Sequence, residues 1–175
     1  MPTYFHVDRR AAFVAGQQVQ PRTLDLNAVP DLATHFSELF PHGVSAHGYQ
    51  YLNSDVLAGR GEPAIELIWE YVRRAFFPDK PSRFIATCAW QTLQEAVEFR
   101  SVTGAPAAKV WMLEADAGFI ADMNLLHAGS STLRVSQFAH RYWSGLSWPA
   151  INGVVTPAPR WEVLLTGAIT VVGEA

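Results

Sequence analysis

The sequence predicts an α+β fold with a mixed or antiparallel sheet. Segments typical of strands are scattered between segments with helical periodicity. The last two strand-like segments, residues 161–165 and 168–172, are joined through Thr166 and Gly167, which is typical of a β-hairpin. A chain of 175 residues without repeats or low-complexity linkers indicates a single domain, residues 1–175, that is long enough to bury a core.

The first half of the chain predicts one strand and two clear helices. Residues 3–8 are a short aromatic and β-branched run, which predicts a strand. Residues 11–19 predict a short helix or turn, and the polar, Gly-rich residues 42–55 predict a loop. Apolar residues recur at helical spacing in 30–40 and, most clearly, in 62–76.

The second half is richer in strands. Its pattern predicts strands at 83–90 and 108–115 and helices at 92–101 and 131–145. A turn around Gly118 leads to the short segment 122–126. The connection 148–159 contains Pro and Gly and leads to the terminal hairpin.

The composition excludes several classes of protein. With 49% hydrophobic and 17% charged residues, the chain is too apolar to be disordered. A net charge of -3 provides no global basic field for nucleic acid. The N-terminus lacks the apolar run of a signal peptide, and no apolar stretch approaches ~18 residues. We therefore expect a cytoplasmic protein without a membrane partner, although export without a cleaved leader would also fit.

Standard catalytic signatures are absent from the sequence. There is no phosphate-binding glycine loop, no GxSxG elbow and no HExxH pair. The single cysteine, Cys88, excludes an internal disulfide and a cysteine-based zinc site, and we interpret it as a core residue rather than a nucleophile. The six histidines are scattered, so we expect no metal site.

Glu162 lies inside the otherwise apolar segment WEVLL. A carboxylate there costs several kcal/mol if it is both desolvated and unpaired. Either Glu162 points to solvent at a sheet edge, or the protein retains it for chemistry.

Three segments, taken in order, resemble the signature strands of the ADP-ribosyltransferase superfamily: YFH at 4–6, FIATCAW at 84–90 and RWEVLL at 160–165. The segment KVWMLEADAGFIADMNLL also resembles the part of rifampicin-modifying members that ends in a functional aspartate, here Asp122. The resemblance implies an α+β, ADP-ribosyltransferase-like fold, with a split mixed sheet around an NAD cleft and flanking helices.

The resemblance also implies roles for individual residues. Glu162 would be the catalytic carboxylate, which stabilises the positive charge that develops when the nicotinamide–ribose bond breaks. His6 would donate to the adenosine ribose, the backbone after it would hold the carboxamide, and Thr87 would bind within the nicotinamide pocket. The implied NAD-binding residues are His6, Val7, Thr87, Trp90 and Asp122.

Each candidate also has a plain structural interpretation. His6 is equally well explained as a half-buried structural histidine, and Thr87 as an ordinary strand residue. Asp122 fits the cap of the segment that follows it. Arg83 fits a solvated or capping residue, or a contact to a phosphate.

The favoured function is NAD-dependent transfer of ADP-ribose to a macromolecular acceptor, as in a toxin, effector or defence enzyme. One alternative keeps the fold but makes the protein an NAD glycohydrolase or a transferase that modifies a small molecule. Another is an inactive fold that binds a protein or a nucleic acid.

Overall fold

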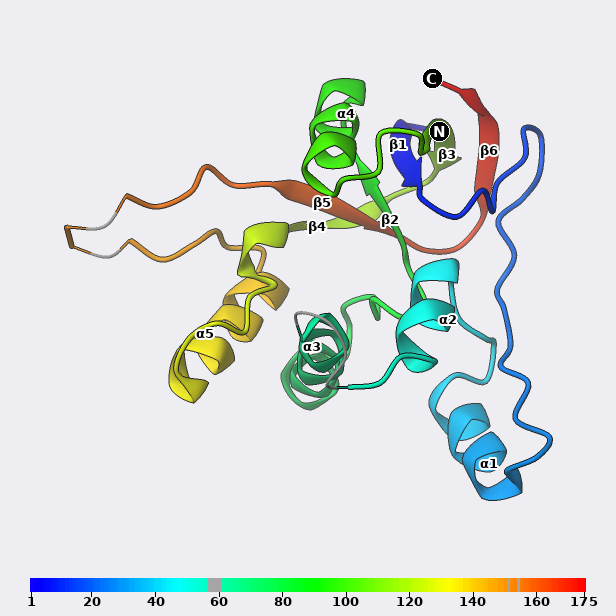
Figure 1. Cartoon of the computed structure of the whole chain (residues 1–175), viewed down its shortest axis with the longest axis horizontal. Helices are drawn as coiled ribbons and strands as arrows, with labels where there is room; N and C mark the ends of the chain where they lie inside the picture. Colours follow the sequence, from blue (N-terminus) through cyan, green and yellow to red (C-terminus); the bar gives the residue numbers. More distant parts are fainter. Residues whose placement is uncertain (57–60, 151, 154) are drawn as a thin grey trace.

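The computed structural model describes the whole chain except residues 57–60, 151 and 154. Its described part contains one six-stranded sheet in the order β4-β5-β2-β1-β3-β6 (Figure 1). The strands are β1 (Thr3–Asp8), β2 (Thr87–Trp90), β3 (Lys109–Ala115), β4 (Gly118–Asp122), β5 (Trp161–Leu165) and β6 (Ile169–Glu174). The α+β class is confirmed. Every strand pairing is antiparallel, which agrees with one of the two sheet types expected from the pattern, whereas the mixed sheet implied by the resemblance is wrong.

Helices cover both faces of this sheet. Figure 1 shows α2, α3 and α5 on one side and α4 on the other. The helices are α1 (Pro30–Leu39), α2 (Ala46–Leu52), α3 (Glu62–Phe76), α4 (Leu93–Val102) and α5 (Thr132–Trp143), with a 3-10 turn, η1 (Met123–Leu125). In the part of the chain that is described, none of them is both long and apolar enough to cross a bilayer.

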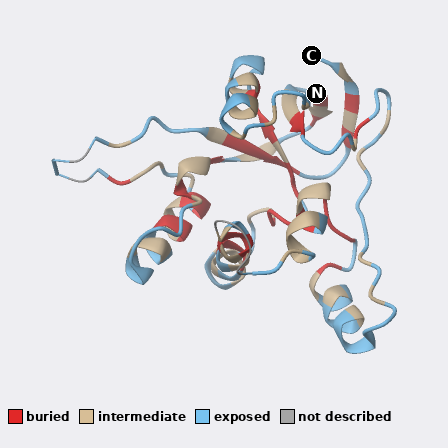
Figure 2. Cartoon of the chain, in the orientation of Figure 1, coloured by how far each residue is buried: buried red, intermediate tan, exposed pale blue. Residues whose placement is uncertain are grey.

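Part of the core lies between the sheet and the helices on each side, and another part is formed by side chains of β2, β3, β5 and β6 together with Phe13. Below the sheet, Trp69 of α3 and Trp143 of α5 pack with Leu164 of β5, and all three are fully buried. Above it, Trp90 and Ala96 belong to a smaller cluster between the strands and α4. Figure 2 shows this burial along the strands and the inner faces of α3 and α5, which is the position expected for the apolar stripe of an amphipathic helix.

Most of the helices and strands predicted from local sequence patterns are confirmed. The predicted strands at 3–8 and 108–115 match β1 and β3, and the helix at 62–76 matches α3. The helices at 92–101 and 131–145 match α4 and α5 within the usual uncertainty of element ends.

Three local predictions differ from the structure. The predicted loop 42–55 contains α2. Its N-cap is Ser45, whose side chain accepts a hydrogen bond from the backbone N–H of Gly48. The turn expected around Gly118 lies just before it, at residue 116, and Gly118 itself begins β4, a strand that the sequence did not predict. The strand expected at 83–90 begins only at Thr87, because the residues before it form turns.

The prediction of a β-hairpin formed by residues 161–165 and 168–172 is also wrong. β5 pairs with β2 and β4, whereas β6 pairs with β3 on the other side of the sheet. Gly167 has φ 79° and provides the turn, but it turns the chain toward a different partner. Burial of Leu164 and Leu165 in the centre of the sheet outweighs the local preference for a hairpin.

The sheet is split between β1 and β2. β1 pairs with β3 from Thr3 to Asp8, but in the described residues it pairs with β2 only at Phe5 and Trp90. The half-sheets β4-β5-β2 and β1-β3-β6 therefore separate beyond this pair. The ring of His6 bridges them, with Nδ1 2.7 Å from the carbonyl oxygen of Cys88.

Candidate functional site

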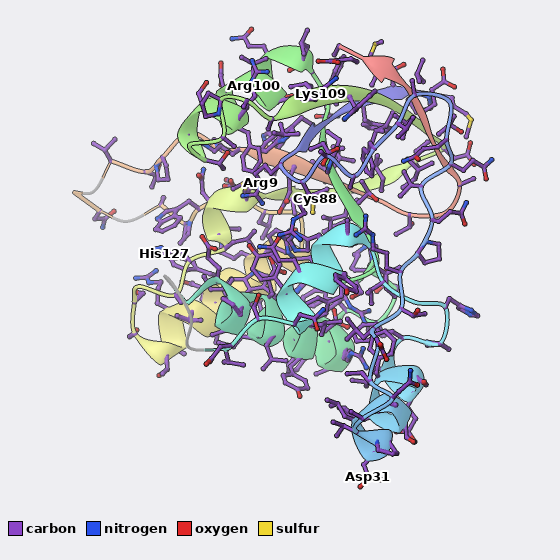
Figure 3. The ribbon with its side chains drawn as sticks, turned by 45° about the vertical axis from the view of Figure 1, so that its right-hand side comes forward. Arg9, Asp31, Cys88, Arg100, Lys109 and His127 are labelled. Carbon is purple, nitrogen blue, oxygen red and sulfur yellow. The ribbon has the colours of Figure 1, made fainter. Side chains whose placement is uncertain are left out.

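A pocket of about 450 Å³ opens where the two half-sheets separate. Its lining includes residues of β1, β2, β5, α2 and α3, and of the segment that follows β1. The volume lies within the usual range for small-molecule sites, about 300–1,000 Å³. Figure 3 labels Arg9 and Cys88, two lining residues, near the meeting of the sheet and α2, and Asp31 far away on α1.

The pocket brings together five of the six predicted site residues. His6 and Val7 come from β1, Thr87 and Trp90 from β2, and Glu162 from β5. These strands are adjacent in the order β5-β2-β1, so positions far apart in the sequence become neighbours. The sixth residue, Asp122, is not among the lining residues.

Glu162 is buried rather than exposed at a sheet edge. β5 lies between β4 and β2, and Glu162 is 3% exposed. Its Oε1 accepts hydrogen bonds from Nη1 of Arg83 and from the hydroxyl of Tyr142, the latter at 2.8 Å. Its Oε2 has no hydrogen-bond partner among the described residues. One carboxylate oxygen is therefore fixed by the protein, while the other is available to a ligand in the pocket.

Arg83 is the counter-ion of Glu162. It is 4% exposed, which corrects the expectation of a solvated or capping arginine. Its Nε and Nη2 donate to Glu66 at 2.8 and 3.0 Å, and its Nη1 also donates to the Tyr142 hydroxyl at 2.6 Å. Burial alone would lower the pKa of Arg83, but the carboxylates of Glu162 and Glu66 raise it well above its ordinary value.

Two partners of Arg83, Tyr142 and Glu66, have shifted pKa values. Burial raises the pKa of Tyr142 well above its ordinary value, so this residue remains a hydroxyl donor to Glu162. Burial would also raise the pKa of Glu66, but Arg83 and His47 together bring it well below its ordinary value. Nε2 of His47 lies 3.1 Å from Oε1 of Glu66. We refer to Glu66, Arg83 and Glu162 as the acidic wall of the pocket, because two carboxylates share one guanidinium.

The geometry of His6 defines its tautomer. Because the Cys88 carbonyl can only accept, Nδ1 carries the proton, and Nε2 of the neutral ring is left as an acceptor. Burial lowers the pKa of His6 from its ordinary value, which favours this neutral form. The ring also packs on Phe13, with 4.7 Å between centroids. With its proton on Nδ1, neutral His6 can accept but not donate a hydrogen bond through Nε2, which differs from the donor expected from the resemblance.

The pocket is also lined, beside the point where the half-sheets separate, by Val7, Thr87 and Trp90. All three are buried, and Trp90 is held by Phe99 of α4 with ring centroids 4.9 Å apart. Cys88 also lines the pocket, but burial raises the pKa of its thiol to about 12. A thiol with such a pKa is not a nucleophile at neutral pH.

Asp122 has a structural position instead. It is fully buried at the end of β4, and its carboxylate accepts from the backbone N–H groups of Asn124, Trp148 and Arg160 at 3.1, 3.3 and 2.9 Å. The capping interpretation made from the sequence describes this geometry. These contacts tie the residues just before β5 to the end of β4.

Three arginines in the pocket lining had no role in the sequence analysis. Arg9, Arg10 and Arg22 come from the segment after β1, and we refer to them as the basic wall. No side-chain ion pair of theirs is present among the described residues. Arg9 lies over the ring of Phe99 and Arg22 over that of Tyr49, at 5.7 and 5.9 Å. Their spacing in sequence follows no motif, so only the fold reveals that they converge.

The nearest acid to the basic wall is already engaged. Asp8 accepts from the backbone N–H groups of Arg10 and Phe13 at 3.1 and 2.9 Å. Burial lowers the pKa of Arg10, and the neighbouring charge of Arg9 lowers it further. Positive charge that lacks a carboxylate partner inside a pocket favours an anionic ligand.

A metal site has no support in the described part of the chain, which contains no group of three or more His, Cys, Asp or Glu side chains arranged to hold an ion. The groups that line the pocket include several carboxylates, two imidazoles and arginines.

A comparison with family models gives one match: a family described as "Protein of unknown function (DUF2441)" matches residues 4–175. Because the match spans nearly the whole chain, the protein belongs to this family. A search of curated proteins finds no match.

The position of Asp122 predicts a loss of stability without a loss of ligand binding. Asp122→Ala leaves three backbone N–H groups without their acceptor, and we expect the free energy of unfolding to fall by about 2–3 kcal/mol. If the pocket binds NAD, as the resemblance implies, the affinity measured by calorimetry should stay at the wild-type value. Asp116→Ala, at an exposed position in the preceding turn, is the control and should change neither. If the Asp122→Ala protein folds but binds NAD much more weakly, Asp122 contributes to ligand binding and the purely structural interpretation is wrong.

The lowered pKa of His6 predicts a pH dependence of stability. Because the unfolded chain binds this proton more readily than the folded protein, stability should fall as pH decreases from about 7.5 to about 5.5, across the ordinary histidine pKa of about 6.5. His6→Gln should reduce this slope in denaturant titrations, whereas His42→Gln, at an exposed position, should not. Equal slopes in wild type and His6→Gln would contradict the neutral form.

Proposed function

We propose that this member of the DUF2441 family cleaves NAD at the nicotinamide–ribose bond and transfers ADP-ribose to a macromolecular acceptor. Glu162 is the catalytic carboxylate in this proposal, and the fold is of the ADP-ribosyltransferase type. The observation that carries the proposal is the state of Glu162: buried in a pocket, fixed through Oε1, with Oε2 left for a ligand.

The arrangement of the strands supports this assignment. The resemblance requires a His, a Thr and a Glu from three separate strands to face one site. In the structure, His6, Thr87 and Glu162 line one pocket and come from adjacent strands. A sheet that separates beside these strands agrees with the split sheet that the resemblance implies.

The charges of the pocket also support NAD as the ligand. The acidic wall carries two carboxylates for one guanidinium, which leaves a surplus of one negative charge when His47, beside Glu66, is neutral. This surplus complements the positive charge of the nicotinamide ring of NAD. The basic wall, Arg9, Arg10 and Arg22, complements the two phosphates, because guanidinium groups pair well with phosphate oxygens.

In the proposed reaction the pocket binds NAD and the acceptor supplies the nucleophile. When the nicotinamide–ribose bond breaks, its electron pair leaves with the nicotinamide nitrogen and positive charge develops on the ribose. A nucleophilic atom of the acceptor then forms the new bond to the ribose carbon and releases its proton to solvent. Oε2 of Glu162 accepts a hydrogen bond from a ribose hydroxyl and stabilises that charge, while Arg83 and Tyr142 hold Oε1 in place. Nε2 of His6 accepts from a hydroxyl of the other ribose, and Thr87 and the backbone at Val7 bind the nicotinamide carboxamide.

Labelled NAD tests the proposed function and separates it from the alternatives. Label on the adenylate part that becomes attached to a macromolecule supports transfer. Release of free ADP-ribose identifies a glycohydrolase, and label on a small molecule identifies a small-molecule transferase. Absence of turnover with intact, folded protein overturns the proposal in favour of an inactive binding module.

Glu162→Gln is the variant that isolates the catalytic charge. We expect NAD cleavage to fall by about 10²–10³-fold, because the neutral amide no longer stabilises the positive transition state. NAD affinity should change much less, because the interaction strengthens as the bond breaks. The melting temperature should also fall, because Arg83 loses one of its two buried carboxylates.

Asp122→Asn provides the control for that variant, because it removes another buried carboxylate that lies outside the pocket. It should retain wild-type turnover at temperatures where it is folded. A Glu162→Gln protein that cleaves NAD at the wild-type rate would remove Glu162 from the reaction.

A further inference from the structure

We infer that Glu66 is a positioning residue for the proposed reaction: it occupies the fork of Arg83 and so keeps Oε2 of Glu162 open to the substrate. This inference rests on the proposed function. It assigns to a residue of α3 a role in catalysis that requires no contact with the reacting atoms.

The hydrogen bonds of Arg83 are divided unequally between the two carboxylates. Glu66 takes the Nε and Nη2 edge of the guanidinium, with Nε to Oε2 at 2.8 Å and Nη2 to Oε1 at 3.0 Å. Glu162 receives only Nη1, and only on Oε1. Arginine and a carboxylate prefer two parallel hydrogen bonds, and Glu66 already has both.

Glu66 is the α3 residue that hydrogen-bonds Arg83, so loss of its charge weakens the hold of α3 on that fork. The guanidinium would turn toward Glu162, bind both of its oxygens and cover Oε2. The pair would also be neutral, so the surplus negative charge of the acidic wall would disappear. A cation held against both oxygens opposes the positive charge that the reaction develops on the ribose.

Burial makes this competition strong. Glu66 and Glu162 are 5% and 3% exposed, so water does not replace the lost partners. Charged hydrogen bonds in such an environment are stronger and less screened than at the surface. Glu66 also stays ionised over the working pH range, because Arg83 and His47 keep its pKa well below the ordinary value despite burial.

The chain provides a matched control one helical turn away. Glu70 of α3 is 4% exposed and binds Arg73 with the same two-bond geometry, at 3.0 and 2.8 Å. It also accepts from Arg74 and Ser82. Unlike Glu66, Glu70 is not among the residues that line the pocket. Loss of its charge disturbs α3 in a similar way without freeing Arg83.

The experiment compares Glu66→Gln with Glu70→Gln in the intact protein, by steady-state kinetics with NAD and by thermal melting. Both variants should lower the melting temperature. For Glu66→Gln we expect kcat to fall by about 10–100-fold, the range typical of lost partners behind functional ligands, with KM changed by less than about threefold. Glu70→Gln should keep kcat within about twofold of wild type. Wild-type kcat in Glu66→Gln, or an equal loss in both variants, would overturn the inference.

A double-mutant cycle with Arg83→Lys tests whether Glu66 acts through Arg83. Lysine cannot form two parallel bonds to a carboxylate, so it cannot cover both oxygens of Glu162. In the Arg83→Lys background, Glu66→Gln should therefore cost much less in kcat than in the wild-type background. If the two losses simply multiply, Glu66 does not act through the guanidinium and the inference is wrong.

Two further outcomes are distinguishable. If Glu66→Gln does not fold, Glu66→Asp replaces it: the charge is kept, but the shorter side chain withdraws from the fork. An intermediate loss of kcat in Glu66→Asp supports the inference, and wild-type kcat overturns it. Absence of NAD turnover in the wild-type protein overturns the proposed function itself, whereas turnover that is indifferent to Glu66 overturns only the inference.

Discussion

The buried guanidinium of Arg83 is the interaction on which the site depends. Arg83 precedes β2 and contacts α3 through Glu66, α5 through Tyr142 and β5 through Glu162. Removal of one partner from a buried ion pair typically costs about 3–5 kcal/mol, because the remaining charge is left uncompensated. Arg83 therefore connects four segments: the residues before β2, α3, α5 and β5. The orientation of the Glu162 carboxylate depends on the packing of all four.

Local patterns account for the elements that were predicted correctly. α3 shows its apolar stripe and α4 its capping box in the sequence itself. The pairing of strands depends instead on which side chains become buried together. The hairpin expected at 161–172 was wrong for this reason, since β5 lies in the centre of one half-sheet and β6 at the edge of the other. α2 was missed because its sequence is short, polar and rich in aromatic residues.

The site was predictable only in part. The resemblance selected His6, Thr87 and Glu162 from the order of three segments, and the structure places all three in one pocket. The sequence predicted that Glu162 either points to solvent at a sheet edge or is retained for catalysis. The structure shows a buried ion pair with Arg83, which neither interpretation included. Such a pair joins residues far apart in the sequence, and no spacing reveals it. The convergence of Arg9, Arg10 and Arg22 was hidden for the same reason.

The charges of the pocket come from different elements: the carboxylates Glu66 and Glu162 from α3 and β5, and Arg9, Arg10 and Arg22 from the segment after β1. A ligand that carries both a cationic group and phosphates can therefore pair with groups of both signs. The two walls also respond differently to the medium. Arg9 and Arg22 are exposed at the surface, where ions screen charges over roughly 8 Å at physiological salt, whereas Glu66 and Glu162 are buried and screened much less. Capture of such a ligand is thus sensitive to ionic strength, while its final alignment is not.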